Sequence, residues 1–200
     1  MNKISDRDAK ALGVFGGTFD PIHIGHLIVA EWIADFLKLE KVCFIPIHRH
    51  PFHKRRHITE GALRLQMIQK AIDPYVNFSV DDFEIKQQTI SYTIDTLQYL
   101  KGQYPQHNLY FIIGDDNLEN FSEWKEPERI LEMCQLAVFR RSLIRPSMPF
   151  HTYRIINIDT PLVQISSSLI RERISQNKCV QTMLPANVYD FIRTHNLYTR

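Results

Sequence analysis

Two histidines stand three residues apart, at His23 and His26, shortly after the adjacent glycines Gly16 and Gly17. The apolar run from Ala11 to Phe15 predicts a buried strand that ends at these glycines. Because glycine has no Cβ, the backbone can turn tightly there and a phosphate can approach the main chain. The spacing therefore indicates a site where imidazoles and backbone N–H groups meet an anion.

The residues after the glycines predict a helix from about Ile24 to Leu37, whose apolar residues recur at helical spacing. Its N-terminus would face the turn, where unpaired N–H groups and the helix dipole favour an anion. The spacing of the histidines puts both imidazoles on one face of the first turn. We interpret the segment as a nucleoside triphosphate site. A metal site, for which two histidines supply too few ligands, ranks second, and histidines in solvent rank third.

Three consecutive hydroxyls, from Ser166 to Ser168, precede a second expected helix that carries Arg171. Serine is an ordinary N-cap residue, and one serine is enough to cap a helix. Three serines followed by an arginine therefore favour a second phosphate cradle over capping alone.

Polar residues also follow the expected strand from Leu109 to Gly114. Asp115 and Asp116 suit ribose hydroxyls or a hydrated Mg2+, and the alternative is a polar loop with an Asx turn. A further helix is expected to begin near Tyr92, where exposed N–H groups could receive a carboxylate. Trp124 offers a flat face for an aromatic ring, although a lone tryptophan is more often a core residue.

These motifs resemble those of known enzymes. The run His23-Ile24-Gly25-His26 resembles the (T/H)xGH signature of a nucleotidyltransferase superfamily. The segment from Ile165 to Arg171 resembles the I-S-S-T-x-I-R signature of nicotinate mononucleotide adenylyltransferases, with Ser168 in place of the threonine. The segment from Ser91 to Leu97 is similar to the S-Y-T-x-D-T-L element of the same enzymes.

Further matches extend the likeness over nearly the entire chain. Gly114, Asp116 and Trp124 match a G-x-D strand end followed by a tryptophan, as in the bacterial enzymes. His53 and Lys54 match a segment ending P-P-H-K, although Phe52 replaces the second proline and the loop is one residue longer.

The resemblance implies transfer of AMP from ATP to nicotinate mononucleotide, giving deamido-NAD and pyrophosphate in NAD biosynthesis. It implies Mg2+ brought with ATP, no metal ligand from the protein, and three groups of site residues. The catalytic residues would be His23, His26, Lys54 and Arg171. The ATP-binding residues would be Gly16, Gly17, Thr18, Phe19, His23, Gly25, His26, Gly114, Asp116, Ile165, Ser167 and Arg171. The residues for nicotinate mononucleotide would be Thr18, Phe19, His53, Lys54, Tyr92, Thr93 and Trp124.

Three alternatives stay open at this point. Pantetheine-phosphate adenylyltransferases resemble the chain in the first signature, but they lack the S-Y-T-x-D-T-L element and the G-x-D with tryptophan. Nicotinamide mononucleotide could be the acceptor. The basic loop from 48 to 57 suggests an RNA-binding or nucleotide-sensing module, against which the intact His23, His26 and Arg171 argue.

The composition sets the class of protein. Two hundred residues suit one domain, 44% of them are hydrophobic and 23% charged, and no apolar run is long enough to span a bilayer. Three scattered cysteines without a C-x-x-C pair argue against a disulfide framework or a zinc knuckle. A net charge of +2 is too small for a general nucleic-acid binder. We expect a cytoplasmic protein with no nucleic-acid or membrane partner, and the oligomeric state is left open.

Alternating strands and helices predict the fold. Residues 1–10 are expected to form a loose tail, and residues 11–200 a single nucleotidyltransferase domain. Further strands are expected near 42–46, 76–80, 109–114, 136–139 and 154–158, and further helices near 61–72, 93–103, 126–133, 167–176 and 187–196. The alternation favours an α/β fold with a Rossmann-like, doubly wound parallel sheet.

Overall fold

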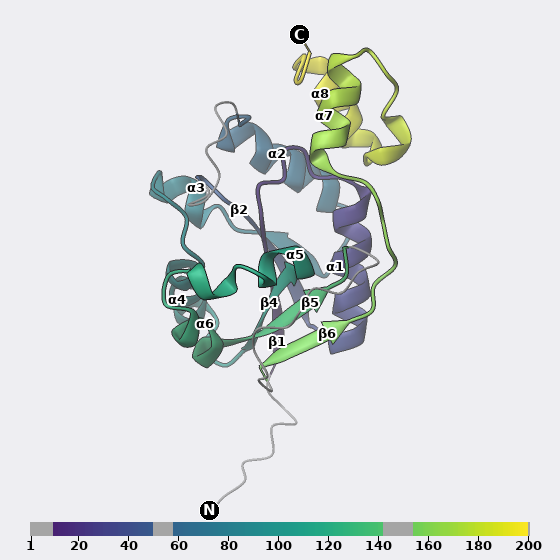
Figure 1. The fold of residues 1–200 in the computed structure, drawn as a ribbon. Coiled ribbons are helices and arrows are strands. Elements are labelled where there is room, and N and C mark those ends of the chain that lie inside the picture. The colour runs from purple at the N-terminus through teal and green to yellow at the C-terminus, as the bar shows by residue number, and fades with distance from the viewer. Residues whose placement is uncertain (1–9, 50–57, 142–153, 200) are drawn as a thin grey trace, which may run out of the picture.

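Residues 10–49, 58–141 and 154–199 are described by the structure, a computed structural model, and in these ranges six parallel strands form one sheet (Figure 1). The strands are β1 (Ala11–Gly17), β2 (Lys41–Pro46), β3 (Phe78–Val80), β4 (Asn108–Gly114), β5 (Cys134–Phe139) and β6 (Ile155–Ile158). Their order is β3-β2-β1-β4-β5-β6, and each neighbouring pair is parallel. This is the strand order of a doubly wound Rossmann-like sheet, so the predicted fold class is confirmed.

Helices cover both faces of this sheet. They are α1 (Ile24–Leu37), α2 (Gly61–Ile72), α3 (Phe83–Gln87), α4 (Thr93–Gln103), α5 (Asp115–Leu118), α6 (Pro127–Met133), α7 (Ser167–Ser175) and α8 (Ala186–Thr194). One buried cluster joins the sheet to α1, α2 and α8, and a second joins it to α4 and α6. After β6 the chain runs past α1 to α7 and α8, and α8 packs beside α2 (Figure 1).

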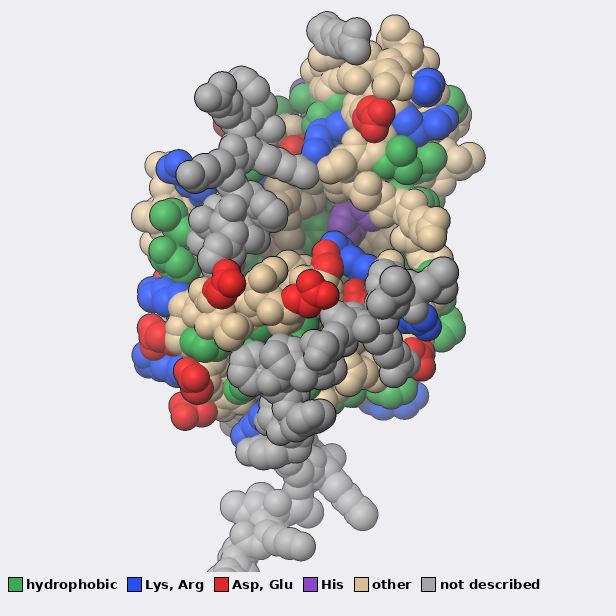
Figure 2. Space-filling view, in the orientation of Figure 1, with side chains coloured by type: hydrophobic (Ala, Val, Ile, Leu, Met, Phe, Trp, Pro, Cys, Tyr) green, Lys and Arg blue, Asp and Glu red, His purple; other side chains and the backbone are tan. Residues whose placement is uncertain are grey.

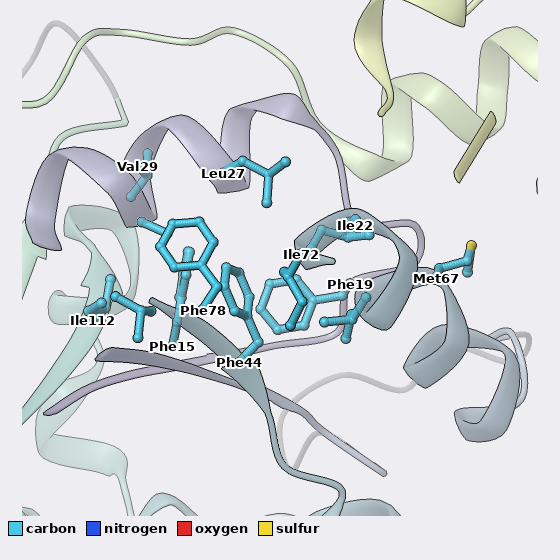
Figure 3. Packing of buried hydrophobic residues seen from close by; sticks show 14 of the residues in the cluster. Phe15, Phe19, Ile22, Leu27, Val29, Phe44, Met67, Ile72, Phe78 and Ile112 are labelled. Carbon is cyan, nitrogen blue, oxygen red and sulfur yellow. The ribbon is translucent and has the colours of Figure 1, made fainter. Parts of the chain in front are cut away.

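The core shows why β1 is a strand. Its side chains alternate, with Leu12 and Val14 in the cluster under α4 and Phe15 in the cluster under α1. Phe15 packs on Phe44 with ring centroids 5.5 Å apart, and Phe44 packs on Phe78 at the same distance (Figure 3). Burial of both faces explains why the strand reads as a continuous apolar run.

The predicted glycine turn is wrong in one respect: β1 continues through Gly16 and Gly17, and no described glycine has a positive φ. Phe19, with φ 47°, takes the left-handed conformation instead. The glycines are needed for space, since a Cβ at Gly17 would lie 2.9 Å from the Phe19 ring. The aromatic residue therefore folds back against the strand end, and the turn begins one step later than the sequence suggests.

The strand order reverses between β1 and β4, which lie side by side. In open parallel sheets, ligands bind beyond the carboxyl ends of the strands at this point. Gly17 and Gly114 end the two strands. Within the described residues, no helix combines the length and hydropathy that a membrane span requires. Residues 1–9 of the predicted tail lie outside the described residues.

Candidate active site

Two adjoining cavities open at the carboxyl end of the sheet. The first has a volume of about 870 Å³ and the second about 490 Å³, sizes that suit nucleotides. Both are lined by Gly16, Gly17, Thr18, Phe139 and Arg141. Figure 2 shows histidine surface inside a hollow on this face, with Lys and Arg side chains near it. We call the larger space the tryptophan cavity, after Trp124, and the smaller one the histidine cavity, after His23 and His26.

The two histidines lie together at the start of α1. His23 is the N-cap residue, and its ring stacks on that of His26 with centroids 3.7 Å apart. The backbone N–H of His23 donates to Nδ1 of His26 over 3.2 Å. In the neutral imidazole this bond assigns the proton to Nε2, so His26 has a donor on the opposite side of its ring. Gly25 leaves room for this arrangement, since a Cβ there would lie 3.1 Å from the His23 ring.

Burial keeps both imidazoles neutral at neutral pH. It lowers the pKa of His23 to about 3, and the positive charge of Arg141 contributes in the same direction. The pKa of His26 is also lowered well below 6.5, first by burial, then by His23 and Arg141. Nδ1 of His23 is a buried nitrogen with no hydrogen-bond partner in the part of the chain that the structure describes. The histidines therefore offer hydrogen bonds rather than fixed charges.

The serine segment at the start of α7 lines the histidine cavity from the other side. Ser166 caps the helix by accepting the N–H of Leu169 over 3.1 Å, so capping accounts for one serine. Ser167 instead donates its hydroxyl to the carbonyl of Pro21 over 2.8 Å. Arg171 donates from Nη1 to the carbonyl of Asp20 over 2.5 Å. The helix is thus joined directly to the turn that follows β1.

Asp20 is the centre of this turn, and it is only 2% exposed. Its Oδ1 accepts the hydroxyl of Tyr198 over 2.7 Å, and its Oδ2 accepts the N–H of Thr59 over 3.4 Å. Arg64, also fully buried, donates from Nε to the carbonyl of Thr59 and from Nη1 to that of Thr18. Residues from three other parts of the chain therefore hold the turn: the segment at Thr59 and Arg64, the start of α7, and Tyr198.

The tryptophan cavity is lined by the start of α4 and by Trp124. Tyr92 is the N-cap residue of α4, and its side chain makes no capping hydrogen bond. Trp124 packs against Phe121 and Phe111, with ring centroids 5.3 and 6.1 Å apart. The indole therefore has a packed side and a side at the cavity.

Arg141 is a site residue that the sequence predictions missed. It lines both cavities and donates from Nη1 to Oδ2 of Asp116 over 3.1 Å, while its backbone N–H donates to Oδ1 of Asp115. A Cβ at Gly114 would clash with Oδ1 of Asp116 and lie 2.8 Å from Nε of Arg141, so a side chain there would have to displace this ion pair. The available signal was the pair Arg140 and Arg141 directly after a buried strand, at the edge of the sheet where ligands bind.

Comparisons with known proteins identify the family of this chain. A family model described as cytidylyltransferase-like matches residues 14–173. A Clostridium perfringens (strain SM101) protein named "Probable nicotinate-nucleotide adenylyltransferase" is 40% identical over 200 residues, covering 96% of this chain and 99% of its own. A protein of the same name from Oceanobacillus iheyensis is 38% identical over 190 residues, covering 94% of this chain and 97% of its own.

The chain belongs to the nicotinate-nucleotide adenylyltransferase family.

Solved structures show the same fold. Plasmodium falciparum nicotinic acid mononucleotide adenylyltransferase complexed with NaAD has a TM-score of 0.76 and 22% identity, with 94% of this chain and 97% of that chain covered. The same protein complexed with APC has a TM-score of 0.74 at the same identity. As a member of the adenylyltransferase family, the chain is a nucleotidyltransferase, and the predicted enzyme class is confirmed.

The structure brings most of the expected adenylyltransferase residues to the two cavities. The residues that line the histidine cavity are Gly16, Gly17, Thr18, Phe19, His23, Gly25, His26, Ile165, Ser167 and Arg171. Gly114 and Asp116, expected with ATP, line the tryptophan cavity together with Tyr92, Thr93 and Trp124. The Phe19 side chain is 2% exposed, so it shapes the strand end from the core. His53 and Lys54 lie outside the described residues.

No group of three or more His, Cys, Asp or Glu side chains is placed to hold a metal ion in the described ranges. The cysteines include two buried ones, Cys43 and Cys134, whose pKa burial raises to about 12, and the exposed Cys179.

Proposed function

We propose that the enzyme transfers the adenylyl group of ATP to nicotinate mononucleotide, with the ATP phosphates beside His23 and His26 and the acceptor's pyridine ring beside Thr93 and Trp124. The observation that carries the proposal is the pair of cavities that share Gly16, Gly17 and Thr18. A donor and an acceptor bound in these spaces would meet at the end of β1. The proposal assigns this chemistry to residues 11–200, the predicted domain.

The reaction needs no covalent intermediate. An oxygen of the nicotinate mononucleotide phosphate attacks the α-phosphorus of ATP, and the bond from that phosphorus to the bridging oxygen breaks. Pyrophosphate leaves with the electron pair, and deamido-NAD remains. Since the attacking phosphate is already a nucleophile, the protein chiefly has to align the two groups and stabilise the charge that develops.

The contacts of His23, His26 and Arg171 support a role for each of them. His26 donates from Nε2 to a phosphate oxygen, and His23 provides a second imidazole beside it. Arg171 and Arg141 supply positive charge that the neutral imidazoles do not. Lys54 stays a predicted clamp over the triphosphate.

The remaining residues form the walls. Gly16, Gly17, Thr18 and Gly25 let phosphates approach the backbone, while Ile165 and Ser167 close the opposite wall. Gly114 and Asp116 would lie near a ribose, whose hydroxyls can donate to the carboxylate. Tyr92 and Thr93 begin α4, whose N-terminal N–H groups suit the nicotinate carboxylate.

Magnesium enters this scheme as part of the substrate, MgATP. The ion keeps several waters and binds mainly to phosphate oxygens, where it offsets their charge. This fits a site made of hydrogen-bond donors and arginines. Since ATP is a cytoplasmic metabolite, the proposed reaction is a cytoplasmic one.

The test is steady-state pyrophosphate release with MgATP and one of three acceptors: nicotinate mononucleotide, nicotinamide mononucleotide or phosphopantetheine. We expect a strong preference for nicotinate mononucleotide. Preference for another acceptor would reassign the tryptophan cavity, and absence of turnover with all three would refute the proposal. RNA binding without turnover would indicate the alternative module.

A further inference from the structure

Glu84 is a buried acid that the proposed mechanism does not use. It lies in the first turn of α3, is 7% exposed, and lines the tryptophan cavity together with Thr93 and Trp124. Its place is unusual because this cavity is proposed to receive a substrate that carries a carboxylate. A buried carboxyl group in such a wall bears on which substrates can enter.

The two oxygens of Glu84 have different surroundings. Oε1 accepts the hydroxyl of Thr96 over 2.5 Å. Oε2 is buried and has no hydrogen-bond partner among the described residues. Ser91 lines the same cavity, and its hydroxyl oxygen accepts the N–H of His48 over 3.0 Å. Since the Thr96 hydroxyl already donates to Oε1, the unpartnered Oε2 is the position open to a proton.

Several groups act on the charge of Glu84. Burial raises the pKa of its carboxyl group, and Asp95 on α4 acts in the same direction. Ser91, Thr96 and the guanidinium of Arg64 on α2 act in the opposite direction, without reversing the shift. The charge of Asp95 is itself offset by Lys125, whose Nζ lies 3.1 Å from it.

We infer that Glu84 determines acceptor specificity: its neutral form admits a pyridine carboxylate to the tryptophan cavity, and its ionised form excludes it. This inference rests on the proposed function. Two carboxylates that share a poorly solvated site do not both ionise readily, so a bound nicotinate keeps the proton on Glu84. A nicotinamide group carries no charge, and its N–H2 can donate to an ionised Glu84.

The experiment measures kcat/KM for nicotinate mononucleotide and nicotinamide mononucleotide, with saturating MgATP, across about pH 5.5 to 9, the range reached by buried glutamates. The readout is the kcat/KM for nicotinate mononucleotide divided by the kcat/KM for nicotinamide mononucleotide. Titration of the acceptor phosphate, of ATP and of the histidines affects both substrates, so it cancels in the ratio. In the natural protein we expect this ratio to fall as the pH rises. The total fall should be about tenfold for each pH unit by which bound nicotinate raises the pKa of Glu84.

Two variants separate the carboxyl group from its surroundings. Glu84→Gln keeps an acceptor for Thr96 and places a permanent donor at the position of Oε2, so we expect a high ratio that does not change with pH. Glu123→Gln is the matched control, because Glu123 is an exposed acid in the wall of the same cavity. Because the charge of Glu123 is solvated, we expect the ratio in Glu123→Gln to depend on pH as it does in the natural protein.

Calorimetry of the unaltered protein supplies a readout that does not depend on any variant. Binding of nicotinate mononucleotide, measured at alkaline pH in two buffers of different ionisation enthalpy, is expected to take up a proton, whereas binding of nicotinamide mononucleotide is not. Any one of three results would overturn the inference. The ratio could be independent of pH in the natural protein, it could change with pH in Glu84→Gln as it does in the natural protein, or the two acceptors could show the same proton uptake. Failure of the proposed function looks different, since neither acceptor would then give pyrophosphate.

Discussion

His26 has one nitrogen occupied by the protein and one available to a ligand. Nδ1 accepts the N–H of His23, so Nε2 is the donor that can face a phosphate. In His26→Ala this donor is lost where charge develops, and we expect kcat to fall by about 10²–10³. Pyrophosphate release with saturating substrates measures the effect.

The matched control is His107→Ala, because His107 is a partly buried histidine that lines neither cavity. Its kcat should equal that of the natural protein. Circular dichroism and thermal unfolding would confirm that both variants fold. Full turnover in a folded His26→Ala protein would show that the imidazole is not the donor.

The same histidines couple stability to pH. Burial lowers the pKa of His23 to about 3, whereas an unfolded histidine titrates near 6.5. Below pH 6.5 the unfolded chain binds protons that the folded chain does not, so the free energy of unfolding decreases as the pH falls toward 3. Each such histidine contributes at most about 1.4 kcal/mol per pH unit.

Urea unfolding across this pH range measures how steeply the free energy of unfolding changes with pH, in the natural protein and in His23→Gln. The variant should have the smaller slope, because it lacks one of the neutral imidazoles. Equal slopes would mean that the folded protein protonates His23 without cost.

At the scale of elements, the C-terminal segment after α8 holds the turn after β1. The Tyr198 hydroxyl donates to a carboxylate oxygen of Asp20, and the carbonyl of Asp20 accepts from Arg171. Tyr198→Phe leaves that oxygen without its donor, which costs about 1.5–3 kcal/mol for a bond to a charged group. In a chain of this length the melting temperature should fall by about 3 to 12 °C, and MgATP should bind more weakly.

Calorimetric melting and MgATP titration test this coupling. Tyr189→Phe is the control, since Tyr189 lies on α8 and lines neither cavity. If Tyr198→Phe lowers the melting temperature but leaves MgATP affinity unchanged, the segment stabilises the fold without positioning the site.

Elements with a strong apolar period could be predicted closely. The helices α1, α2 and α4 begin and end at the predicted residues, because three or more turns of spaced apolar side chains face the sheet. The short helices α3 and α5 were not predicted, since five and four residues do not show a full period. Strand ends differ from the predictions by a few residues, as the continuous apolar runs do not mark them.

Local motifs predicted many of the residues that line the two cavities, because the histidines and the serine segment are each contiguous in sequence. What could not be predicted are contacts between distant residues. Asp20 and Tyr198 are separated by 178 positions, and neither lies in a pattern that points to the other. The unpartnered oxygen of Glu84 likewise exists only because α3, α4 and α2 pack around it.

At the scale of the whole molecule, the histidine cavity is assembled from the beginning, middle and end of the chain: the turn after β1, the residues after β5, and the start of α7. A ligand that contacts all three should stabilise the fold as one unit, because it binds the folded state and not the unfolded one. At 100 times its Kd, MgATP should add about 2.7 kcal/mol, or roughly 5 to 10 °C in melting temperature.

Two arginines on α7 provide the comparison. Arg171 lines the cavity and joins α7 to the turn, whereas Arg173 donates to the carbonyl of Cys179 and does not line it. Both substitutions by alanine should lower the melting temperature of the free protein, since each removes a hydrogen bond to a backbone carbonyl. Only Arg171→Ala should lose most of the upward shift that MgATP causes, measured by differential scanning calorimetry at equal nucleotide concentration. An equal loss in Arg173→Ala would mean that α7 acts on the nucleotide through its packing alone, and an intact shift in Arg171→Ala would remove the guanidinium from the phosphate site.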